Sequence, residues 1–387
     1  MPEAVIVATA RTPIGRANKG SLADVRPDDL AAFAVRSVMA KVPEVDAGEI
    51  VDVMIGCGFP QDKQGMNLGR RVALLAGLPE HVPGTTVNRF CASSTQTIRM
   101  AYHAIKAGEG DVFIAGGVES ISQVEGYPKD MEELHPKLFG DDAPIANVYI
   151  PMGMTAENVA DQYDVSRDDM DRFAQNSQER AVAAQASGFF AREIVPFTKD
   201  DGTVVEADDG PRPSSTYEKL QTLDPVFKTD GRVTAGNSCP LNDGAAAVLV
   251  MSDERAEQLG LKPLARIVAT SVSGVAPEIM GVGPIEAVRK VLKQAGMSID
   301  DIDVVELNEA FAAQVIASAR EFGVDPFDTK LNPHGGAIAL GHPYGMTGAR
   351  IMGTLLNDLQ TKDQAIGLET MCVGGGQGMA IIVERLT

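Results

Sequence analysis

The sequence of 387 residues contains no tryptophan and only four cysteines, and its hydrophobic runs are short. The longest run, residues 245–251, falls far below the roughly 18 residues that a membrane-spanning helix requires. The cysteines are widely separated and include no C-x-x-C pair, which argues against a disulfide framework and a cysteine-ligated zinc site. They are Cys57, Cys91, Cys239 and Cys372. These absences predict a protein without a membrane span or a bound metal, in the reducing environment of the cytoplasm.

Basic residues are also scarce. Lysine and arginine total 34 against 53 aspartate and glutamate residues, which gives a net charge of −19, and no segment is rich in lysine or arginine. A nucleic acid partner would require a basic face, so we exclude it. The proportions of hydrophobic (44%) and charged (22%) residues are those of a globular protein. If the substrate is an anion, the few cations must be concentrated where it binds.

Short runs of β-branched residues alternate with helical patterns along the chain, which is typical of α/β architecture. Residues 4–10 are followed at once by Arg11 and lack a basic leader, so we expect a first strand here rather than a signal peptide. Gly108 is placed to end the helix that precedes it. The expected elements of this part are strands at residues 5–9, 51–55 and 111–117, a helix at 30–39, and a strand, turn and helix over 85–106.

The second part of the chain repeats this plan in the same order. The offset between matching segments falls from 261 to 251 residues and then stays constant, which predicts a duplicated α/β unit. The matches pair residues 6–9 with 267–270, 34–36 with 287–289, 52–53 with 303–304, Arg99 with Arg350, and Gly116 with Gly367. We therefore expect a first half (residues 1–118 plus 242–262) and a second half (263–387), separated by an insertion (119–241).

The insertion differs in composition from the two halves, because it is expected to contain loops rich in proline, glycine and aspartate around one long helix. Ser166 and Asp169 are spaced as a capping pair at the start of this helix, and Gly188 follows its end. Its inward face is expected to consist of Met170, Phe173, Ala174, Ser177 and Ala181. An insertion of this length between two repeats favours a substrate-binding subdomain, with a purely structural addition as the alternative.

Cys91 follows the strand that ends near Asn88 and begins a predicted helix. The positive end of a helix dipole lowers the pKa of a thiol, so a reactive thiolate is one interpretation, and a small buried hydrophobic residue is the other. The constant offset of 251 residues relates Cys91 to His342, which would place a nucleophile and a base at equivalent helix starts. Two helix ends related by a pseudo-twofold axis can meet at one point, which favours the reactive interpretation.

Two further segments carry groups suited to acyl chemistry. Cys372 precedes the glycine-rich segment 374–378, whose backbone N–H groups can approach a ligand oxygen; a tight turn and a weak phosphate-binding loop are the alternatives. Asn308 follows the predicted strand 303–307, at the edge where open α/β sheets place their sites, although a helix cap is the commoner role for a lone asparagine.

These segments closely resemble motifs of the thiolase family, in the same order and over the whole chain. The matching segments are residues 87–94, 234–244, 308–311, 335–343 and 372–378. Residues 87–93 and 115–120 are more similar to degradative 3-ketoacyl-CoA thiolases than to biosynthetic acetoacetyl-CoA thiolases. The resemblance implies two fused halves that form a five-layered α/β/α/β/α core, with an inserted loop domain that holds coenzyme A (CoA).

The resemblance also implies a reaction, the thiolytic cleavage of a 3-ketoacyl-CoA by CoA to acetyl-CoA and a shortened acyl-CoA, as in fatty acid β-oxidation. Cys91 would attack the keto carbon and keep the shortened chain as a thioester, and Cys372 would protonate the departing acetyl-CoA carbanion. His342 would activate Cys91 and then the CoA thiol, and Asn308 would hold a water that, with His342, stabilises the enolate. The N–H groups of Cys91 and Gly374 would bind the oxyanion of the acyl-enzyme.

CoA is expected as a co-substrate rather than a permanently bound cofactor, and the resemblance implies its contacts. These are Arg212, Lys219, Phe227, Ala235, Cys239, Ala310 and Phe311. Arg212 and Lys219 suit the phosphates of the nucleotide and Phe227 offers a flat face for adenine; solvated surface charges are the alternative for the two cations. Cys239 occupies a position where serine is common in the family, which would alter the pantetheine contact. His334 is expected to line the site.

The residues leave alternatives open. The nearest is an acetyl-CoA C-acetyltransferase, which makes acetoacetyl-CoA, and ketosynthases share the fold but would carry a second histidine where this chain has Asn308 and Cys372. A second cysteine in a glycine turn argues against a Cys/His/Asn hydrolase. The presence of all four predicted catalytic residues argues against a non-catalytic acyl-CoA carrier. By resemblance we also expect a homodimer or homotetramer, acting alone or beside a hydratase/dehydrogenase subunit. Acyl chain length would depend on the loop of residues 119–151.

Overall fold

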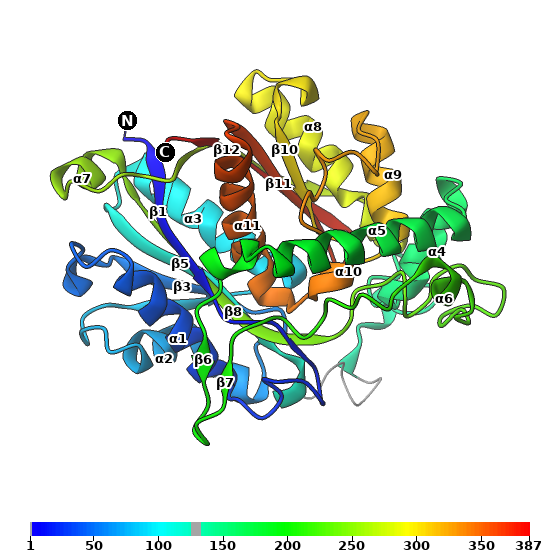
Figure 1. Cartoon of the computed structure of the whole chain (residues 1–387), viewed down its shortest axis with the longest axis horizontal. Helices are drawn as coiled ribbons and strands as arrows, with labels where there is room; N and C mark the ends of the chain where they lie inside the picture. Colours follow the sequence, from blue (N-terminus) through cyan, green and yellow to red (C-terminus); the bar gives the residue numbers. More distant parts are fainter. Residues whose placement is uncertain (1, 125–132) are drawn as a thin grey trace.

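The computed structural model describes residues 2–124 and 133–387 of the chain (Figure 1). The strands of the first half are β1 (Ala4–Arg11), β3 (Asp52–Gly56), β4 (Gly84–Val87), β5 (Val112–Ser120) and β8 (Asn242–Ser252). Those of the second half are β9 (Ala265–Gly274), β10 (Val304–Leu307), β11 (Ile366–Val373) and β12 (Gln377–Arg385). They form a sheet in the order β10-β11-β12-β9-β1-β8-β5-β3-β4. The short β2 (Gly15–Arg16) pairs with β8, and β6 (Phe197–Thr198) pairs with β7 (Val204–Val205).

The pairing of these strands shows the duplication directly. In the first half β3 and β5 are parallel, and β8 runs antiparallel between β5 and β1. In the second half β10 and β11 are parallel, and β12 runs antiparallel between β11 and β9. The halves join where β1 meets β9 through two residue pairs, Val5 with Arg266 and Ile6 with Ala265. The predicted duplication of an α/β unit is therefore confirmed.

The predicted offset between the halves is wrong by three residues. The helices α3 (Ser93–Ala107) and α11 (Thr347–Lys362) begin 254 residues apart, as do β5 and β11. His342 thus lies five residues before α11, whereas Cys91 lies two residues before α3. Because the connections between equivalent elements differ in length, the matches at an offset of 251 residues, including Cys91 with His342, do not join equivalent positions.

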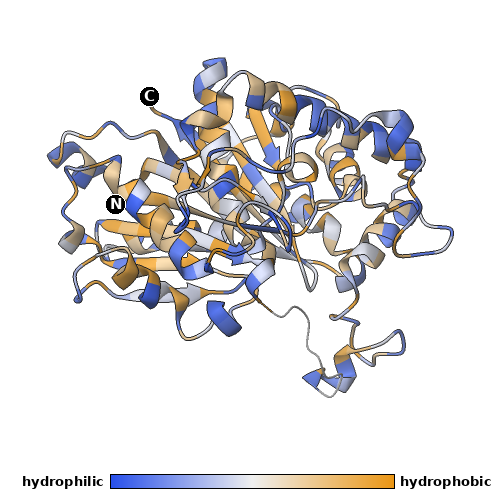
Figure 2. Ribbon diagram, turned by 60° about the horizontal axis from the view of Figure 1, so that its bottom comes forward, coloured by the Kyte–Doolittle hydropathy of each residue, from blue (hydrophilic) through white to orange (hydrophobic). Residues whose placement is uncertain are grey.

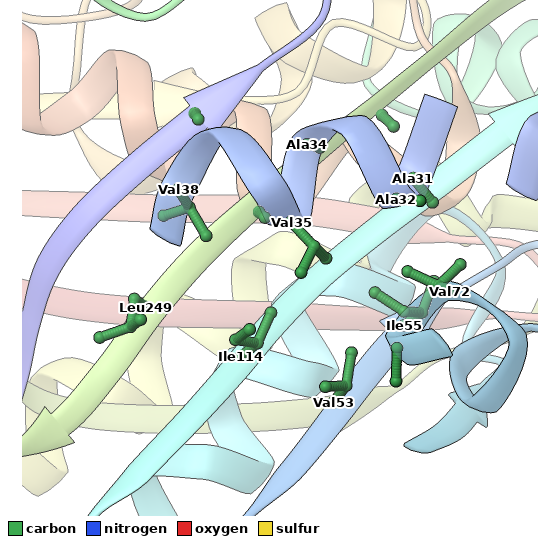
Figure 3. Packing of buried hydrophobic residues seen from close by; sticks show 14 of the residues in the cluster. Ala31, Ala32, Ala34, Val35, Val38, Val53, Ile55, Val72, Ile114 and Leu249 are labelled. Atoms are coloured by element: carbon green, nitrogen blue, oxygen red, sulfur yellow. The ribbon is translucent and has the colours of Figure 1, made fainter. Parts of the chain in front are cut away.

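One outer layer consists of α1 (Pro27–Ala40) and α2 (Leu68–Leu75), which cover the first half of the sheet (Figure 3). Apolar residues of α1 recur at spacings of three and four, so they share one buried face. This face consists of Ala31, Ala34, Val35 and Val38, and it packs with Val72 of α2 on Val53, Ile55, Ile114 and Leu249 of the strands.

The central layer consists of α3 and α11, which lie between the two halves of the sheet. Their buried side chains, such as Ile98 of α3 and Leu355 of α11, share one core cluster with inward residues of β1, β8, β9 and β12. The helices also meet directly, because Ala349 N donates to Ser94 Oγ at 2.9 Å. The second outer layer is formed by α8 (Gly283–Ala295) and α9 (Ala312–Phe322). The chain therefore has the predicted five-layered α/β/α/β/α core.

The insertion contributes α4 (Met152–Gln162), α5 (Arg167–Ala186) and α6 (Tyr217–Gln221). Ser166 Oγ accepts from Asp169 N at 3.0 Å, which confirms the predicted start of α5, and Gly188 follows its end with a φ of 75°. The predicted inward face of α5 is buried, namely Met170, Phe173, Ala174, Ser177 and Ala181. α5 contacts α9 and α10 (Ala337–Leu340), so the insertion packs on the second half.

Hydropathy follows these layers. Figure 2 shows hydrophobic strands inside the molecule and hydrophilic residues along the outer helices. A short surface helix, α7 (Asp253–Gln258), leads from β8 towards β9. Within the described ranges, no helix is both long and apolar enough to cross a membrane.

Candidate active site

Cys91 lies in a 3-10 turn, Phe90–Ala92, between β4 and α3. Phe90 has a left-handed backbone (φ 41°), and its N–H donates to Asn88 Oδ1 at 2.8 Å. Ser93 Oγ donates to Phe90 O at 2.7 Å, which closes the turn from the helix side. These bonds fix the thiol at the point where β4 leads into α3.

The environment of Cys91 disfavours its charged form. Burial raises the pKa of the thiol to about 12, and a hydrogen bond from Gly374 N–H opposes this shift. The thiol therefore does not have the lowered pKa that its place before a helix predicts, because the loss of hydration is the largest cause of the shift. Cys91 is therefore a neutral thiol near pH 7, and it needs a base to accept its proton during attack.

His342 can supply that base. Burial, and then Arg350, lower the pKa of the imidazole to about 3, so the ring is neutral. Its Nδ1 lies 2.7 Å from Thr347 Oγ1, and that hydroxyl donates to Pro343 O at 2.9 Å. Because the hydroxyl has one hydrogen, Thr347 accepts from Nδ1–H, which leaves Nε2 as the basic nitrogen. Nε2 lies 3.3 Å from Asn308 Nδ2.

Asn308 lies directly after β10, at the predicted strand end. Its Oδ1 is buried and has no hydrogen-bond partner among the described residues. A buried amide oxygen in this state is costly unless a water or a ligand meets it. Glu309 holds the segment in place, since its carboxylate accepts from Ser177 Oγ at 2.6 Å and from Asn332 Nδ2 at 2.9 Å. The amide oxygen of Asn308 is thus available for a water or a ligand.

Cys372 lies in β11, two residues before the glycine turn that leads to β12, and its side chain is fully buried. Gly375 (φ 78°) and Gly376 (φ 84°) give the turn its left-handed backbone, which favours glycine. Burial raises the pKa values of Cys372 and Cys239, and the nearby Cys91 raises both further. The three thiols therefore form one cluster, in which Cys372 and Cys239 are protonated.

The site is also organised by Thr347 and Glu119, which were not among the predicted site residues. The buried carboxylate of Glu119 accepts from Gly58 N at 2.7 Å and from Gly345 N at 2.9 Å, so it ties together loops of the two halves. The adjacent rings of Phe59 and Tyr344 meet edge to face, with centroids 5.7 Å apart. Glu119 belongs to the 115–120 motif, but its partners lie far away in sequence, and no local pattern reveals them.

A pocket of about 240 Å³ opens beside Cys91. It is lined by Phe59, Phe90, Cys91, Val148, Tyr149, Met152, Tyr344, Gly374 and Gly375. Val148 and Tyr149 belong to the loop that was expected to govern acyl chain length, whose residues 125–132 lie outside the described part of the chain. The pocket is placed to receive a group bound to the sulfur of Cys91.

A second groove, of about 330 Å³, lies on the insertion. Its lining includes Arg16, Arg212, Lys219, Ala235 and Ser238. Burial lowers the pKa of Arg212, and the neighbouring Arg16 lowers it further, so two guanidinium groups lie close together. In a chain with a net charge of −19, this concentration of cations suits an anion such as a nucleotide phosphate.

Two of the expected site residues lie outside the groove. Phe227 does not line it with Arg212 and Lys219; its ring lies against Phe311, with centroids 6.5 Å apart, and contact between this ring and adenine stays a prediction. His334 does not line the site either, because its ring stacks on Phe189 with centroids 3.6 Å apart. In both cases packing between distant segments, rather than proximity to a motif, decides the position.

Cys239, Ala310 and Phe311 connect the groove to the thiol cluster. Cys239 N donates to Ala310 O at 3.0 Å, and Ser238, which lines the groove, pairs with Phe311. Ala310 and Phe311 share a hydrophobic cluster with Cys372. A ligand that extends from the groove to Cys91 would pass these residues.

The site as a whole combines a thiol nucleophile, a neutral imidazole, a second thiol, an amide with an unpaired oxygen among the described residues, and a backbone N–H. Such a set can transfer an acyl group through a thioester and stabilise the charge that develops on oxygen. In residues 2–124 and 133–387, no group of three or more histidine, cysteine or acidic side chains is arranged to hold a metal ion.

The comparisons with known proteins agree with this geometry. Family models for the thiolase N-terminal and C-terminal domains match residues 4–254 and 261–385. A β-ketoadipyl-CoA thiolase of Acinetobacter baylyi is 46% identical over all of both chains, and a 3-ketoacyl-CoA thiolase of Bacillus subtilis is 46% identical over 99% of this chain and 100% of that protein. The crystal structure of Bacillus anthracis acetyl-CoA acetyltransferase matches with a TM-score of 0.91 and 39% identity, over 100% of this chain and 99% of that one. The chain therefore belongs to the thiolase family and is an acyltransferase with CoA as its co-substrate.

Proposed function

We propose that this thiolase cleaves 3-ketoacyl-CoA esters in the degradative direction, as in fatty acid β-oxidation. The observation that carries the proposal is the position of Cys91 in the wall of an apolar pocket, with its sulfur bonded by Gly374 N–H and near Cys372. The names of two relatives, a β-ketoadipyl-CoA thiolase and a 3-ketoacyl-CoA thiolase, support cleavage of a 3-ketoacyl-CoA without specifying the pathway.

In the first half-reaction, Nε2 of His342 takes the proton of Cys91 as the sulfur attacks the keto carbon. The bond between C2 and C3 of the substrate then breaks, the shortened chain stays on Cys91 as a thioester, and the electron pair leaves as the enolate of acetyl-CoA. A water held by Asn308 and His342 stabilises this enolate, and the thiol of Cys372 protonates it.

In the second half-reaction, His342 first returns its proton to the Cys372 thiolate. It then accepts the proton of the CoA thiol, whose sulfur attacks the thioester, while the N–H groups of Cys91 and Gly374 bind the oxyanion. Collapse of this intermediate releases the shortened acyl-CoA, and the proton on His342 returns to Cys91. Every proton taken up is therefore released within the site.

The alternative is an acetyl-CoA C-acetyltransferase, which joins two acetyl groups, and the matching Bacillus anthracis structure carries that name. The same residues would serve the reverse reaction. The pocket of about 240 Å³ favours cleavage of longer chains, because an acetyl group on Cys91 would leave most of it unfilled. A Cys/His/Asn hydrolase would leave Cys372 without a role, and a non-catalytic carrier would have no need of the complete set.

The proposal is tested by measuring CoA-dependent cleavage of 3-ketoacyl-CoA esters of increasing chain length, followed by the absorbance of their enolate form. Condensation of acetyl-CoA is measured with the same enzyme. We expect cleavage of esters longer than acetoacetyl-CoA to be faster than condensation. Failure to cleave any ester would refute the proposal, and condensation faster than every cleavage would favour the alternative.

The variant Cys372→Ala is expected to separate the two chemical steps. Without this thiol the acetyl-CoA carbanion is not protonated, so cleavage falls by roughly 100- to 10,000-fold. Cys91 should still accept an acyl group from a simple acyl-CoA thioester, which intact-protein mass spectrometry detects as an adduct. An enzyme whose Cys91 is not acylated would contradict this division of roles.

The variant Thr347→Val is expected to lower kcat by roughly 100-fold, because the imidazole of His342 loses the acceptor that keeps its proton on Nδ1. Thr347→Ser keeps the hydroxyl and is the matched control, with activity close to that of the parent enzyme. Steady-state cleavage of one ester at saturating CoA measures both. Equal activity of the valine and serine variants would show that the hydroxyl does not set the tautomer.

The double variant Arg212→Ala/Lys219→Ala is expected to raise the KM for CoA by roughly tenfold or more, since it removes two cations from the proposed nucleotide groove. The kcat should change little, because the groove is separate from the thiols. Lys262→Ala/Lys293→Ala, which removes two exposed lysines outside the groove, controls for net charge. An unchanged KM for CoA in the double variant would place the nucleotide elsewhere.

We also propose a reducing, cytoplasmic location and a homo-oligomeric assembly. All four cysteines are free, and the mechanism requires two of them as thiols. Assembly as a homodimer or homotetramer, and association with a hydratase/dehydrogenase subunit, stay predictions that light scattering of the purified protein and co-purification test.

A further inference from the structure

The pocket beside Cys91 is lined almost entirely by apolar atoms. Its side chains are the aromatic rings of four residues together with Val148, Met152 and the thiol of Cys91. The four aromatic residues are Phe59, Phe90, Tyr149 and Tyr344. Among the described residues, no lysine, arginine or histidine lines it. A chain held in this pocket is therefore surrounded by groups that neither carry nor neutralise charge.

The side chains named above form an apolar wall beside the glycine turn of residues 374–376, whose Gly374 N–H bonds the sulfur of Cys91. A methyl group placed on Gly374 would lie 3.6 Å from Phe90 Cδ2 and 3.7 Å from Met152 Sδ. A methyl group placed on Gly375 would lie 3.3 Å from Val148 Cγ2. The space beside the turn is therefore narrow, and an acyl chain that leaves Cys91 runs along these side chains within van der Waals distance.

Behind the aromatic wall lies a buried carboxyl group, that of Glu119, rather than a cation. The buried carboxylate of Glu119 accepts from the N–H groups of Gly58, Phe59 and Gly345, so these donors are not free to bind a substrate. Edge-to-face contacts link Phe59 to Phe90, with centroids 6.4 Å apart, and also to Tyr344. The wall is thus fixed in place by a group that offers an anionic chain end no counter-charge.

Arg89 is adjacent in sequence to Phe90 of this wall, and its guanidinium already donates hydrogen bonds to two glutamine side chains. Arg89 Nη1 donates to Gln377 Oε1 at 2.7 Å, and Arg89 Nε donates to Gln96 Oε1 at 3.1 Å. These partners belong to β12 and α3, and neither they nor Arg89 line the pocket. A carboxylate carried into the pocket would lose its hydration without gaining a cation from these residues.

We propose that the acyl pocket selects a neutral, apolar acyl chain and discriminates against a chain that ends in a carboxylate. This inference rests on the proposed function and narrows its substrate class. It predicts a different substrate preference from that of the relatives named β-ketoadipyl-CoA thiolases, because the acyl chain of β-ketoadipyl-CoA ends in a free carboxylate.

The test compares two six-carbon substrates that differ in the chain end, 3-oxohexanoyl-CoA and 3-oxoadipyl-CoA. We expect kcat/KM to be roughly 100-fold higher for the neutral ester, because a carboxylate would be buried unpaired. A preference of at least tenfold for the neutral ester supports the inference, and a smaller or reversed preference overturns it. If the enzyme cleaves 3-oxoadipyl-CoA well, the proposed function stands and only the inference fails; if it cleaves neither ester, the proposed function fails.

A charge introduced into the wall provides the second test. Met152→Lys is expected to raise the ratio of kcat/KM for 3-oxoadipyl-CoA over 3-oxohexanoyl-CoA by at least tenfold relative to the parent enzyme. Met152→Gln has a similar length without the charge and should not raise this ratio. If the lysine variant leaves the ratio unchanged while cleaving the neutral ester, Met152 does not contact the acyl chain and the inference is overturned.

Discussion

Replacing Cys91 with alanine is expected to lower the rate of thiolysis by roughly 10,000-fold or more. The reaction passes through a thioester on this sulfur, and no other thiol can replace it. Of the four cysteines, all of which the structure describes, Cys91 lines the pocket that would receive the acyl chain, whereas Cys57, Cys239 and Cys372 do not. Because Cys91 is a neutral thiol whose pKa burial raises to about 12, its attack also depends on the neutral His342.

The effect is measured as the initial rate of 3-oxohexanoyl-CoA cleavage at saturating CoA, with mass spectrometry to detect an acyl adduct. Cys239→Ser is the matched control, since it removes a thiol of the same cluster but restores the residue type common in the family. That variant should keep most of the kcat and the acyl adduct. Near-normal cleavage by Cys91→Ala would show that the acyl group is carried elsewhere.

The largest effect on stability is expected from Arg11→Met. The Arg11 guanidinium is buried and bonds Asp208 twice, at 2.7 and 2.9 Å, and Glu193 once, at 2.8 Å. These contacts join β1 to the insertion, and Glu193 also accepts from Thr354 of α11 at 3.2 Å. Without the guanidinium, two buried carboxylates lose their counter-charge, so the free energy of unfolding should fall by about 3–5 kcal/mol.

Urea titration followed by fluorescence or circular dichroism measures this loss. Arg289→Met is the control, because it removes an exposed pair with Glu321 at 2.9 Å and should cost about 0–1 kcal/mol. A similar small cost for Arg11→Met would show that water or a rearranged side chain replaces the guanidinium. Cleavage activity at low temperature should survive in the folded fraction, since Arg11 does not line the pocket beside Cys91.

Local sequence patterns were sufficient to predict the secondary structure and the positions of several site residues. The Ser166 cap, the stop at Gly108 and the position of Asn308 after a strand depend on neighbouring residues, and each is found where the pattern predicts it. The duplicated plan was also visible, but short matches could not fix its offset, because connections of different length separate the equivalent elements.

Properties that depend on distant contacts could not be predicted. The pKa of Cys91 is governed by burial among several loops rather than by the helix that follows it. Thr347 and Glu119 act through bonds that only the assembled halves create. The ring of Phe227 packs on Phe311, which is distant in sequence, and it does not line the cationic groove.

The place of β8 in the sheet has a consequence for the nascent chain. β8 separates β1 from β5, so both of these strands are left with an open edge until residue 252 has emerged from the ribosome. At roughly 5–20 residues per second, synthesis of residues 121–241 alone takes about 6–24 seconds. During this interval the hydrophobic edges can pair with other chains, which makes the newly synthesised first half a natural client for a chaperone.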